Sequence, residues 1–447
     1  MKNLSGSSND QKNGEISAVS PFTRRNFIKG AAGSSLWLSM ANRLGAQSGS
    51  AALQTQVGAI RGVRVGSPIT VPDNFGDTWV STWASDDNLY APSNDTLGFE
   101  IPDFLTKEQI KLFQIDFAGF LKQLTADRRK QFMSRFAPIA FSRVEGSDPL
   151  HLHGVTVNRM RDFVAQDNLN EEFVSAMVEG RKPKPPADGR SWKSSGCAFI
   201  DGALYWVIAR HQYPEHDDIK GLRQNAKNAS IIKSTDFGKT WTRSAAENLD
   251  SPMFPGTHFA TPYFIDYGRN RLHVDGADRY VYATSNNGFW DNGDSLVLGR
   301  VLRSRIGHLN GSDWEFFLGG DGARDASWTS DASKAKPIIE KPGQLGETGA
   351  VYLPARQRYM LIGWYYPGGS GYFKGSSNKT IWDFYESPKP WGPWTLIGSH
   401  EFSPQGYYCP GVCPKFQSAD KVYVTTAGDF NNWWDHYRLT MVPVDLS

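Results

Sequence analysis

The chain has little net charge and no concentration of basic residues. Its 447 residues include 48 Lys and Arg against 46 Asp and Glu, which gives a formal net charge of +2. A strong positive field is the electrostatic sign of binding to nucleic acid or to an anionic membrane surface. No basic stripe with interleaved aromatic residues is found either. The sequence therefore argues against a nucleic-acid partner.

The chain also lacks an apolar run of transmembrane length near its start. Residues 30–41 are modestly apolar, but they are too few to span a bilayer. They follow the segment 23–29, Thr-Arg-Arg-Asn-Phe-Ile-Lys, and precede the small residues of 44–49. This arrangement predicts a twin-arginine signal peptide and leader over residues 1–48, and export to the periplasm or the extracellular space. No stable membrane insertion is expected once the signal is removed.

Cysteine is scarce, with only Cys197, Cys409 and Cys413. In an oxidising compartment Cys409 and Cys413 are close enough in sequence to form a small loop disulfide, and two free thiols are the open alternative. Two thiolates without a nearby His make half a zinc site. His151 and His153 alternate on an expected strand and face one side, but no third ligand can be named. No cofactor is therefore expected, and a divalent metal is unsupported.

Aromatic and turn-forming residues are abundant. The chain contains 15 Trp, 17 Tyr and 26 Phe, together with 44 Gly and 25 Pro. This combination is typical of an all-β architecture with many short strands and an aromatic-lined surface.

The spacing of β-prone runs predicts the kind of all-β fold. The expected strands beyond Trp192 cover residues 197–200, 203–209, 228–234, 240–242, 260–266, 279–285, 295–302, 314–318, 348–353, 359–365, 380–387, 394–400, 413–416, 422–427 and 437–442. Grouped in threes and fours, they make about five sheets, as in a β-propeller whose closed ring keeps its edges short. We therefore predict a five-bladed β-propeller over residues 71–447, preceded by a tether at 49–70.

One stretch departs from the β pattern. Between residues 106 and 136 the apolar residues recur at helical spacing; they are Ile110, Phe113, Phe117, Phe120, Leu121 and Leu124. We expect a helical insertion at about 102–145, in or after the first blade. It either forms a wall over the cleft or shields a sheet edge. A shorter helix is expected at 170–179.

The segment 234–241 matches the S-x-D-x-G-x-T-W pattern called an Asp box, which occurs in sialidase-type and other propellers. Its chemistry is structural. Asp236 is expected to bond turn amides, Gly238 to adopt a positive φ, and Trp241 to pack between sheets. The pattern indicates a fold and no activity.

Acidic and indole side chains gather in residues 76–99. Carboxylates bind hydroxyl groups and aromatic rings cover apolar sugar faces, so this mixture suits a sugar-binding cleft. Asp77 and Asp95 are expected at strand ends beside Trp79 and Trp83, whereas Asp86 and Asp87 are assigned to turns. The alternative is that the aspartates cap turns and the tryptophans fill a core.

Several stretches together resemble a known group of proteins. Residues 76–99, 195–210, 234–241, 392–395 and 414–420 occur in that order. They resemble an exported bacterial propeller group within a large family long labelled as a domain of unknown function, which includes arabinan-cleaving glycoside hydrolases with five blades. The resemblance covers roughly residues 70–447 without the helical insertion. It implies that an acidic residue on the first innermost strand, here Asp77, acts at the cleft, with Asp95 beyond the next strand.

A propeller gathers the first strand of each blade around its axis, so blade-entry residues should build the cleft. The candidates are Asp77, residues 193–196, Arg210, His211, His258, Thr261, Glu347, Tyr407 and Tyr408. Glycoside hydrolysis needs two carboxylates, one protonated and one ionised. Asp77 fits as base or nucleophile and Glu347 as acid, because the glycines around Glu347 allow close approach of substrate. An exposed loop acid is the alternative for Glu347.

A second chemistry fits another cluster. Lyase cleavage of a uronic-acid polymer needs a cation or His to neutralise the carboxylate and a Tyr or His base. Arg210, His211, Tyr213 and His216 lie together after an apolar strand. Some propeller-fold ulvan-degrading lyases, which this set resembles, use His, Tyr and Arg in this way.

The sequence thus predicts an exported, monomeric propeller that acts on a polysaccharide or oligosaccharide. A glycoside hydrolase is the first choice, a polysaccharide lyase the second and a non-catalytic glycan-binding protein the third. The residues expected to contact substrate are Trp79, Trp83, Tyr213, Asn228, His258, Tyr365 and Tyr407.

Overall fold

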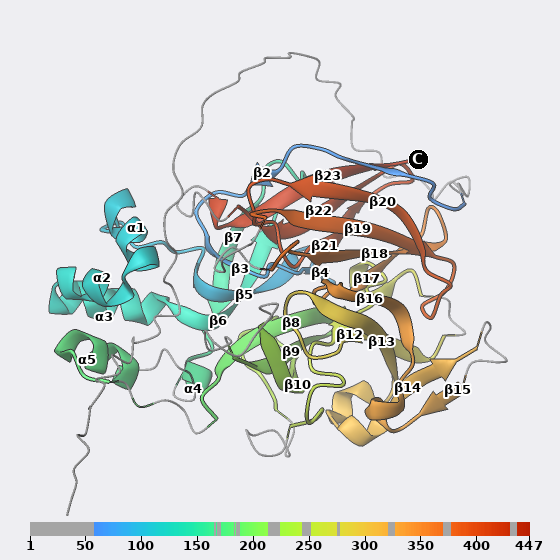
Figure 1. Ribbon diagram of the computed structural model, residues 1–447, viewed down its shortest axis with the longest axis horizontal. Helices are drawn as coiled ribbons and strands as arrows, with labels where there is room; N and C mark the ends of the chain where they lie inside the picture. Colours follow the sequence, from blue (N-terminus) through green and yellow to red (C-terminus); the bar gives the residue numbers. More distant parts are fainter. Residues whose placement is uncertain are drawn as a thin grey trace, which may run out of the picture.

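The computed structural model describes residues 58–164, 167, 171–182, 184, 188–212, 224–243, 252–274, 278–320, 327–369, 377–429 and 436–447. The strands form five sheets of mostly antiparallel neighbours (Figure 1). Contacts join each sheet to the next, and the fifth sheet to the first through β21 and β4. The prediction of a five-bladed β-propeller is therefore confirmed. The predicted signal peptide lies outside the described residues.

The blades follow one another along the chain. The first contains β3 (Phe75–Asp77), β4 (Thr82–Trp83), β5 (Leu89–Gly98), β6 (Ala137–Glu145) and β7 (His153–Asn158). The second contains β8 (Ser191–Ile200), β9 (Ala203–Gln212) and β10 (Asn225–Ser234). The third contains β11 (Tyr263–Phe264), β12 (Tyr280–Asn286), β13 (Gly293–Leu302), β14 (Trp314–Gly319), β15 (Ser327–Thr329) and β16 (Pro337–Leu345).

The fourth blade contains β17 (Ala350–Leu353), β18 (Arg358–Tyr365), β19 (Thr380–Ser387) and β20 (Thr395–Phe402). The fifth contains β21 (Gly411–Gln417), β22 (Lys421–Ala427) and β23 (Leu439–Leu446), joined by β1 (Val63–Val65) and β2 (Ile69–Thr70). Short 3-10 helices occupy Arg269–Arg271, Ile306–His308, Gly311–Asp313 and Ala332–Lys334.

The N-terminal strand closes the ring. β1 pairs antiparallel with β23, so that Val63 lies opposite Leu446, and β2 pairs with another part of β23. Residues 49–70 were expected to be a tether, but part of that segment belongs to the fifth blade. The propeller therefore begins before residue 71.

The helical insertion forms a lobe beside the blades (Figure 1). It comprises α1 (Lys107–Ile115), α2 (Phe117–Gln123) and α3 (Ala126–Arg135), while α4 (Arg161–Val164) and α5 (Glu171–Glu179) follow β7. A capping box starts α1, because the Thr106 hydroxyl accepts the Gln109 N–H and the Gln109 side chain accepts the Thr106 N–H. The insertion was expected to extend to residue 145. Instead it ends before Ala137, because β6 pairs along β5 and is mostly buried.

The sequence pattern did not predict β15 and β16. β15 has only three residues, and β16 contains Pro337, Pro342 and Gly343, which are unfavourable inside a strand. β16 lies along β13, with breaks in register.

The turn Ser234–Trp241 follows β10 of the second blade and packs against the first blade. Asp236 Oδ1 accepts the Thr240 N–H at 2.9 Å, and Gly238 has a φ of 87°. The Trp241 ring lies 4.8 Å from Phe141 of β6 and 5.4 Å from Trp206 of β9. The turn therefore stabilises the contact between blades.

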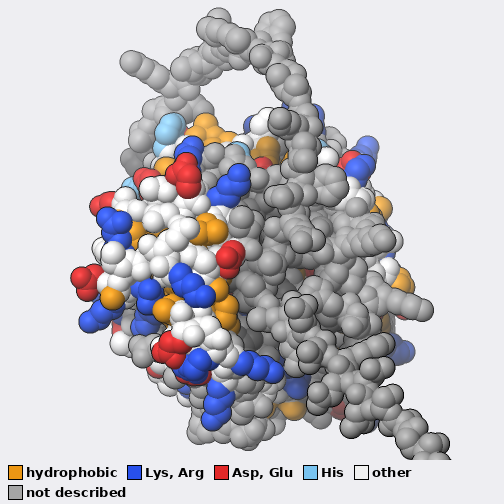
Figure 2. Space-filling view, turned by 60° about the vertical axis from the view of Figure 1, so that its left-hand side comes forward, with side chains coloured by type: hydrophobic (Ala, Val, Ile, Leu, Met, Phe, Trp, Pro, Cys, Tyr) orange, Lys and Arg blue, Asp and Glu red, His pale blue; other side chains and the backbone are white. Residues whose placement is uncertain are grey.

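The surface agrees with the small net charge. On the face shown in Figure 2, acidic and basic side chains are interspersed with scattered hydrophobic ones. Within the described ranges, no helix is long and apolar enough to cross a membrane.

Candidate functional site

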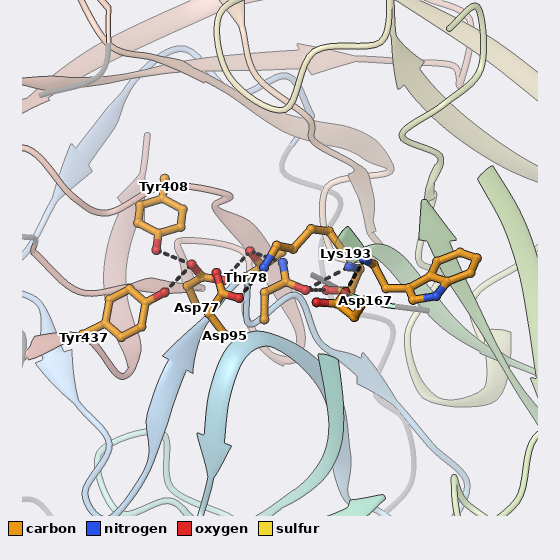
Figure 3. A network of polar contacts seen from close by, with 10 residues as sticks. Asp77, Thr78, Asp95, Asp167, Lys193, Tyr408 and Tyr437 are labelled. Carbon is orange, nitrogen blue, oxygen red and sulfur yellow. Dashed lines mark hydrogen bonds and ion pairs between the residues drawn. The ribbon is translucent and has the colours of Figure 1, made fainter. Parts of the chain in front are cut away.

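Asp77 lies at the end of β3 in the centre of a buried polar network (Figure 3). Its Oδ2 accepts the Tyr408 hydroxyl at 2.6 Å and also the Tyr437 hydroxyl. Its Oδ1 accepts the Thr78 hydroxyl at 3.1 Å. Asp77 is 8% exposed. The carboxyl is thus held by three O–H donors, two of which come from the fifth blade.

The backbone around Asp77 is irregular for a steric reason. Gly76 has a φ of 148°, and a Cβ at this position would lie 2.5 Å from the Thr96 hydroxyl. The register between β3 and β5 shifts between Phe75 and Asp77, so the pairing contains a bulge. Bulges redirect side chains, and this one accompanies the orientation of Asp77 toward the fifth blade.

Asp95 also lies in this irregular region. It was expected at a strand end, but it lies inside β5 with a φ of 44°. Its carboxylate forms a buried ion pair with Lys193 of β8, in the second blade. Burial raises the pKa of Asp77 to about 6 with help from the Asp95 charge, while Lys193 and the two tyrosine hydroxyls oppose the rise.

Glu347 is the second central carboxyl. It lies between β16 and β17 and is fully buried, so it is not an exposed loop acid. Its Oε2 accepts the Ser195 hydroxyl at 3.0 Å, and its Oε1 accepts the Cys409 thiol, with 3.7 Å between oxygen and sulfur. Burial raises the pKa of Glu347 to about 8, and these donors oppose the rise together with Tyr263.

The backbone of Glu347 is fixed by Trp364. The Gly346 N–H donates to the Trp364 carbonyl at 2.7 Å, and the Trp364 indole N–H donates to the Glu347 carbonyl at 2.9 Å. A Cβ on Gly346 would lie 2.3 Å from the indole ring, so only glycine fits. Gly346 was expected to allow close approach of substrate, but it allows close packing of the Trp364 ring instead.

The cysteines are all free. Cys409 contacts Glu347, whereas Cys413 lies in another buried cluster with Trp79. The disulfide alternative is therefore wrong for this structure. Burial raises the pKa of the Cys409 thiol well above its usual value, so the thiol stays protonated as a donor.

Besides Thr78 and Cys409, the sequence did not predict Tyr437 and Trp290 as site residues. Tyr437 precedes β23, and Trp290 lies in the β12–β13 connection, where its ring is 5.0 Å from Tyr408 and 5.2 Å from Trp364. The Trp290 carbonyl accepts the Glu347 N–H at 3.0 Å. Tyr437 begins an expected strand, so its position at the start of a blade strand could have identified it. Trp290 lies in a turn, and no sequence pattern marks it as a site residue.

Arg210 has a structural role. It is fully buried, and its Nε and Nη2 donate to the two carboxylate oxygens of Asp188 at 2.8 and 2.7 Å. His211 is buried beside it, and burial together with Lys193, Arg190 and Arg210 lowers its pKa well below the usual value. The imidazole is therefore neutral, and the cation expected for a lyase, Arg210, is paired with Asp188.

Trp79 is too deeply buried to be a sugar platform, and Trp83 lies away from Asp77. Trp79 is fully buried and donates to the Gly76 carbonyl at 2.9 Å. Trp83 lies in β4, which pairs with the start of β5, whereas β3 and Asp77 pair with its second half. The alternative prediction, that the tryptophans fill a core, is therefore correct for Trp79. Trp83 lies at the other end of the blade from Asp77, and its indole N–H donates to Asp87.

The remaining expected substrate contacts lie elsewhere or make other contacts. Asn228 accepts the Gly256 N–H at 2.9 Å, and Tyr407 stacks on Phe402 at 4.3 Å. Tyr365 lies under Lys341, 5.5 Å from its ammonium group, and His258 is exposed before β11. Tyr213 lies outside the described residues. Among the described residues, no hydrogen bond or ion pair joins Asn228, His258, Tyr365 or Tyr407 to Asp77 or Glu347.

The histidine pair does not form a metal centre in the described part of the chain. His151 bonds to Asp148 at 2.7 Å and His153 to Glu145 at 3.2 Å, and both imidazoles are exposed. Among the described residues, no three His, Cys, Asp or Glu side chains are grouped so that they could hold a metal ion.

No family model matches the chain, and no curated protein sequence does. Among solved structures, it is similar to the β-xylosidase RS223, with a TM-score of 0.41 and 11% identity over 85% of this chain and 94% of that one. It is also similar to a xylan β-1,4-xylosidase from Bacillus halodurans, with a TM-score of 0.40 and 10% identity over 84% of this chain and 54% of that one. A third similar structure is a GH43_1 enzyme from Xanthomonas citri in complex with xylotriose. Its TM-score is 0.38 and its identity 10%, over 88% of this chain and 90% of that one. At these identities and TM-scores, the reactions of those proteins are not transferred to this chain.

Proposed function

We propose that this protein is a glycoside hydrolase in which Asp77 is the base or nucleophile and Glu347 is the general acid. The observation that supports this most is the pair of buried central carboxyls whose environments separate their pKa values, to about 6 for Asp77 and about 8 for Glu347. Between these values Asp77 is ionised and Glu347 is protonated. Glycoside hydrolysis requires this division between two carboxyl groups.

Each side chain in the network has a part in the proposed reaction. Glu347 gives its proton to the glycosidic oxygen as the bond breaks, while the Asp77 carboxylate either activates water or attacks the anomeric carbon. Tyr408 and Tyr437 orient the Asp77 carboxylate by donating to one of its oxygens. Ser195 and Cys409 orient the Glu347 carboxyl. Such positioning reduces the reorganisation that the transition state needs.

The charges favour hydrolysis over elimination. A lyase needs a cation to neutralise the uronate, but the guanidinium of Arg210 binds Asp188 and the ammonium of Lys193 binds Asp95. A binding protein, in turn, has no need of two carboxyls whose desolvation is this costly. These contacts support a hydrolase and a neutral glycan as its substrate.

We also propose that the protein is exported by the twin-arginine route, to act on a polysaccharide or oligosaccharide outside the cytoplasm. The segment 23–29 supports this proposal, with the small residues at 44–49 as its cleavage region. Fractionation of expressing cells, with Arg24 and Arg25 changed to Lys as the comparison, tests it. Equal export of both proteins would contradict the proposal.

The reaction is tested by incubating the purified protein with neutral and uronic-acid glycans. Both new reducing ends and near-UV absorption from a new C=C bond are followed. We expect reducing ends only, and their loss in Asp77→Asn and Glu347→Gln. Asp266→Asn is the matched control, because burial also raises the pKa of Asp266 to about 6 although it bonds to Thr82 and Gly268. Full activity of Asp77→Asn, or an unsaturated product, would overturn the assignment.

A further inference from the structure

The aromatic core of the helical lobe is organised around Phe113 of α1. Its ring lies 5.3 Å from Phe117, 5.4 Å from Phe120, 5.7 Å from Phe132 and 5.7 Å from Phe136, and these pairs meet edge to face. All five side chains are buried. Close packing of this kind leaves little free volume, so shortening one ring opens a cavity chiefly beside the rings that it contacts directly.

The same phenylalanine contacts the wall of the central site. The Phe113 ring lies 5.9 Å from Phe75, which is on β3 two positions before Asp77. The Phe75 ring in turn lies 5.0 Å from the ring of Tyr437. Tyr437 donates its hydroxyl to Asp77 Oδ2. A continuous set of contacts therefore joins the lobe to the carboxyl.

We propose that the helical lobe positions the Asp77 carboxyl through Phe113, which fixes the rings of Phe75 and Tyr437 from outside the blades. That the lobe positions a catalytic group rests on the proposed function of Asp77 as base or nucleophile. The contacts that connect Phe113 to Asp77 do not depend on that function. The lobe lies between β5 and β6 in sequence, so it is connected directly to the blade that supplies Asp77 and Asp95.

The contact is suited to this role because a hydroxyl–carboxylate bond depends on both distance and angle. Shortening Phe113 leaves a cavity that surrounding rings fill only partly. Phe75 borders that cavity. Movement of its ring removes support from the Tyr437 ring that packs against it, which weakens the bond from Tyr437 to Asp77. Phe120 is buried in the same lobe, but it contacts Phe113, Phe117 and Phe132 and not Phe75. It is therefore a matched control.

The expected electrostatic effect has a definite sign. The titratable groups that face Asp77 are Asp95 from β5, Lys193 from β8, Glu347 before β17, Tyr408 and Cys409 before β21, and Tyr437 before β23. The hydrogen bond from Tyr437 lowers the pKa of Asp77. Weakening that bond must therefore raise it.

The test compares Phe113→Leu with Phe120→Leu in full-length mature protein labelled with 13C at the aspartate side-chain carboxyl. The Asp77 resonance is assigned by its loss in Asp77→Asn, and its midpoint is followed against pH at matched thermal stability. We expect Phe113→Leu to raise the midpoint by about half a pH unit, and Phe120→Leu to leave it in place. Equal midpoints in the two variants would overturn the proposal.

A double variant tests the route. Tyr437→Phe removes the hydroxyl and should raise the midpoint by itself. Phe113→Leu added to Tyr437→Phe should then have little further effect, because the two changes act through one bond. Full additivity would overturn the route through Tyr437. Phe75→Leu is a second variant for the same comparison if Phe113→Leu does not fold.

The titration separates this proposal from the proposed function, since it needs no substrate. If no glycan is cleaved but the midpoint moves as expected, the function fails and the structural coupling remains. If a glycan is cleaved, Phe113→Leu should reduce kcat several-fold with KM nearly unchanged, and Phe120→Leu should reduce neither. A change in KM alone would overturn the positioning role.

Discussion

Tyr408 and Cys409, neighbours in the chain, donate to different central carboxyls. The Tyr408 hydroxyl lies 2.6 Å from Asp77 Oδ2, and the Cys409 thiol lies 3.7 Å from Glu347 Oε1. Cys409 has a φ of 49°, an uncommon value for a residue with a Cβ. One short segment before β21 thus fixes the two acids relative to each other. The first and fourth blades supply the carboxyls, and the fifth supplies the connection.

The activity should have a bell-shaped dependence on pH. Asp77 must be ionised, so kcat/KM should fall below about pH 6, and Glu347 must be protonated, so it should fall above about pH 8. The measurement is initial rates of reducing-end release against pH. A profile that keeps rising above pH 9 would contradict the role of Glu347 as acid.

Removing either carboxyl should greatly reduce kcat. We expect Asp77→Asn and Glu347→Gln to lower it by roughly 10² to 10⁴-fold, the range typical of a lost acid or base. Both changes keep the side-chain shape, so a circular dichroism spectrum serves as the folding control. Loss of activity in Asp266→Asn to the same degree would show that buried carboxyls in general, and not this pair, are needed.

The contribution of Glu347 to stability should fall as pH rises through the neutral range. Burial raises the pKa of Glu347 from its ordinary 4.5 to about 8, so between these values the folded protein keeps a proton that the unfolded chain releases. This contribution is largest at the acidic side of the range and falls until pH passes about 8.

Glu347→Gln should remove most of that dependence and be more stable than the wild type at pH 9, by a few kcal/mol. Urea unfolding at pH 5.5, 7 and 9 measures the difference. Parallel curves for the two proteins would contradict it.

The turn between the first two blades should affect stability and not chemistry. In Gly238→Ala the new Cβ would lie 2.6 Å from the Phe141 ring, at a φ of 87° that disfavours alanine. We expect a loss of roughly 1–3 kcal/mol in the free energy of unfolding. The pH profile of the remaining activity should be unchanged, and a shift in either limb would contradict a purely structural role.

Arg210 separates hydrolysis from elimination. Lysine cannot reproduce its two-point bond to Asp188, so Arg210→Lys should lower the free energy of unfolding by roughly 1–3 kcal/mol. The rate at low temperature should stay close to that of the wild type. Abolition of activity in a folded Arg210→Lys protein would favour the lyase.

Much of the fold could be predicted because local signals suffice for it. The hairpin β8–β9 with Asp201-Gly202 at its turn, and the apolar spacing around Phe113, are written in neighbouring residues. The start of β6 was misread as helix because a strand buried on both faces has no alternation to detect. β16, with its prolines, contradicted strand propensity and is held by pairing with β13.

The site could be predicted only in part. The buried central positions of Asp77 and Glu347 could be expected because blade-entry positions meet at the axis of a propeller; their catalytic roles stay a prediction. Trp79 was misassigned because a buried indole and a sugar platform have the same sequence appearance. The pairing of Arg210 with Asp188, and of Lys193 with Asp95, depends on contacts between segments far apart in the sequence. Tyr437 reaches Asp77 across the ring closure, which local patterns do not encode.

That closure has a consequence for the order of synthesis and folding. β1 pairs with β23, so β1 cannot form its hydrogen bonds until Leu439–Leu446 have been synthesised. The ring cannot close on the ribosome while β23 is still in the exit tunnel. A chain truncated before Leu439 would lack β23 and would therefore leave the circle open.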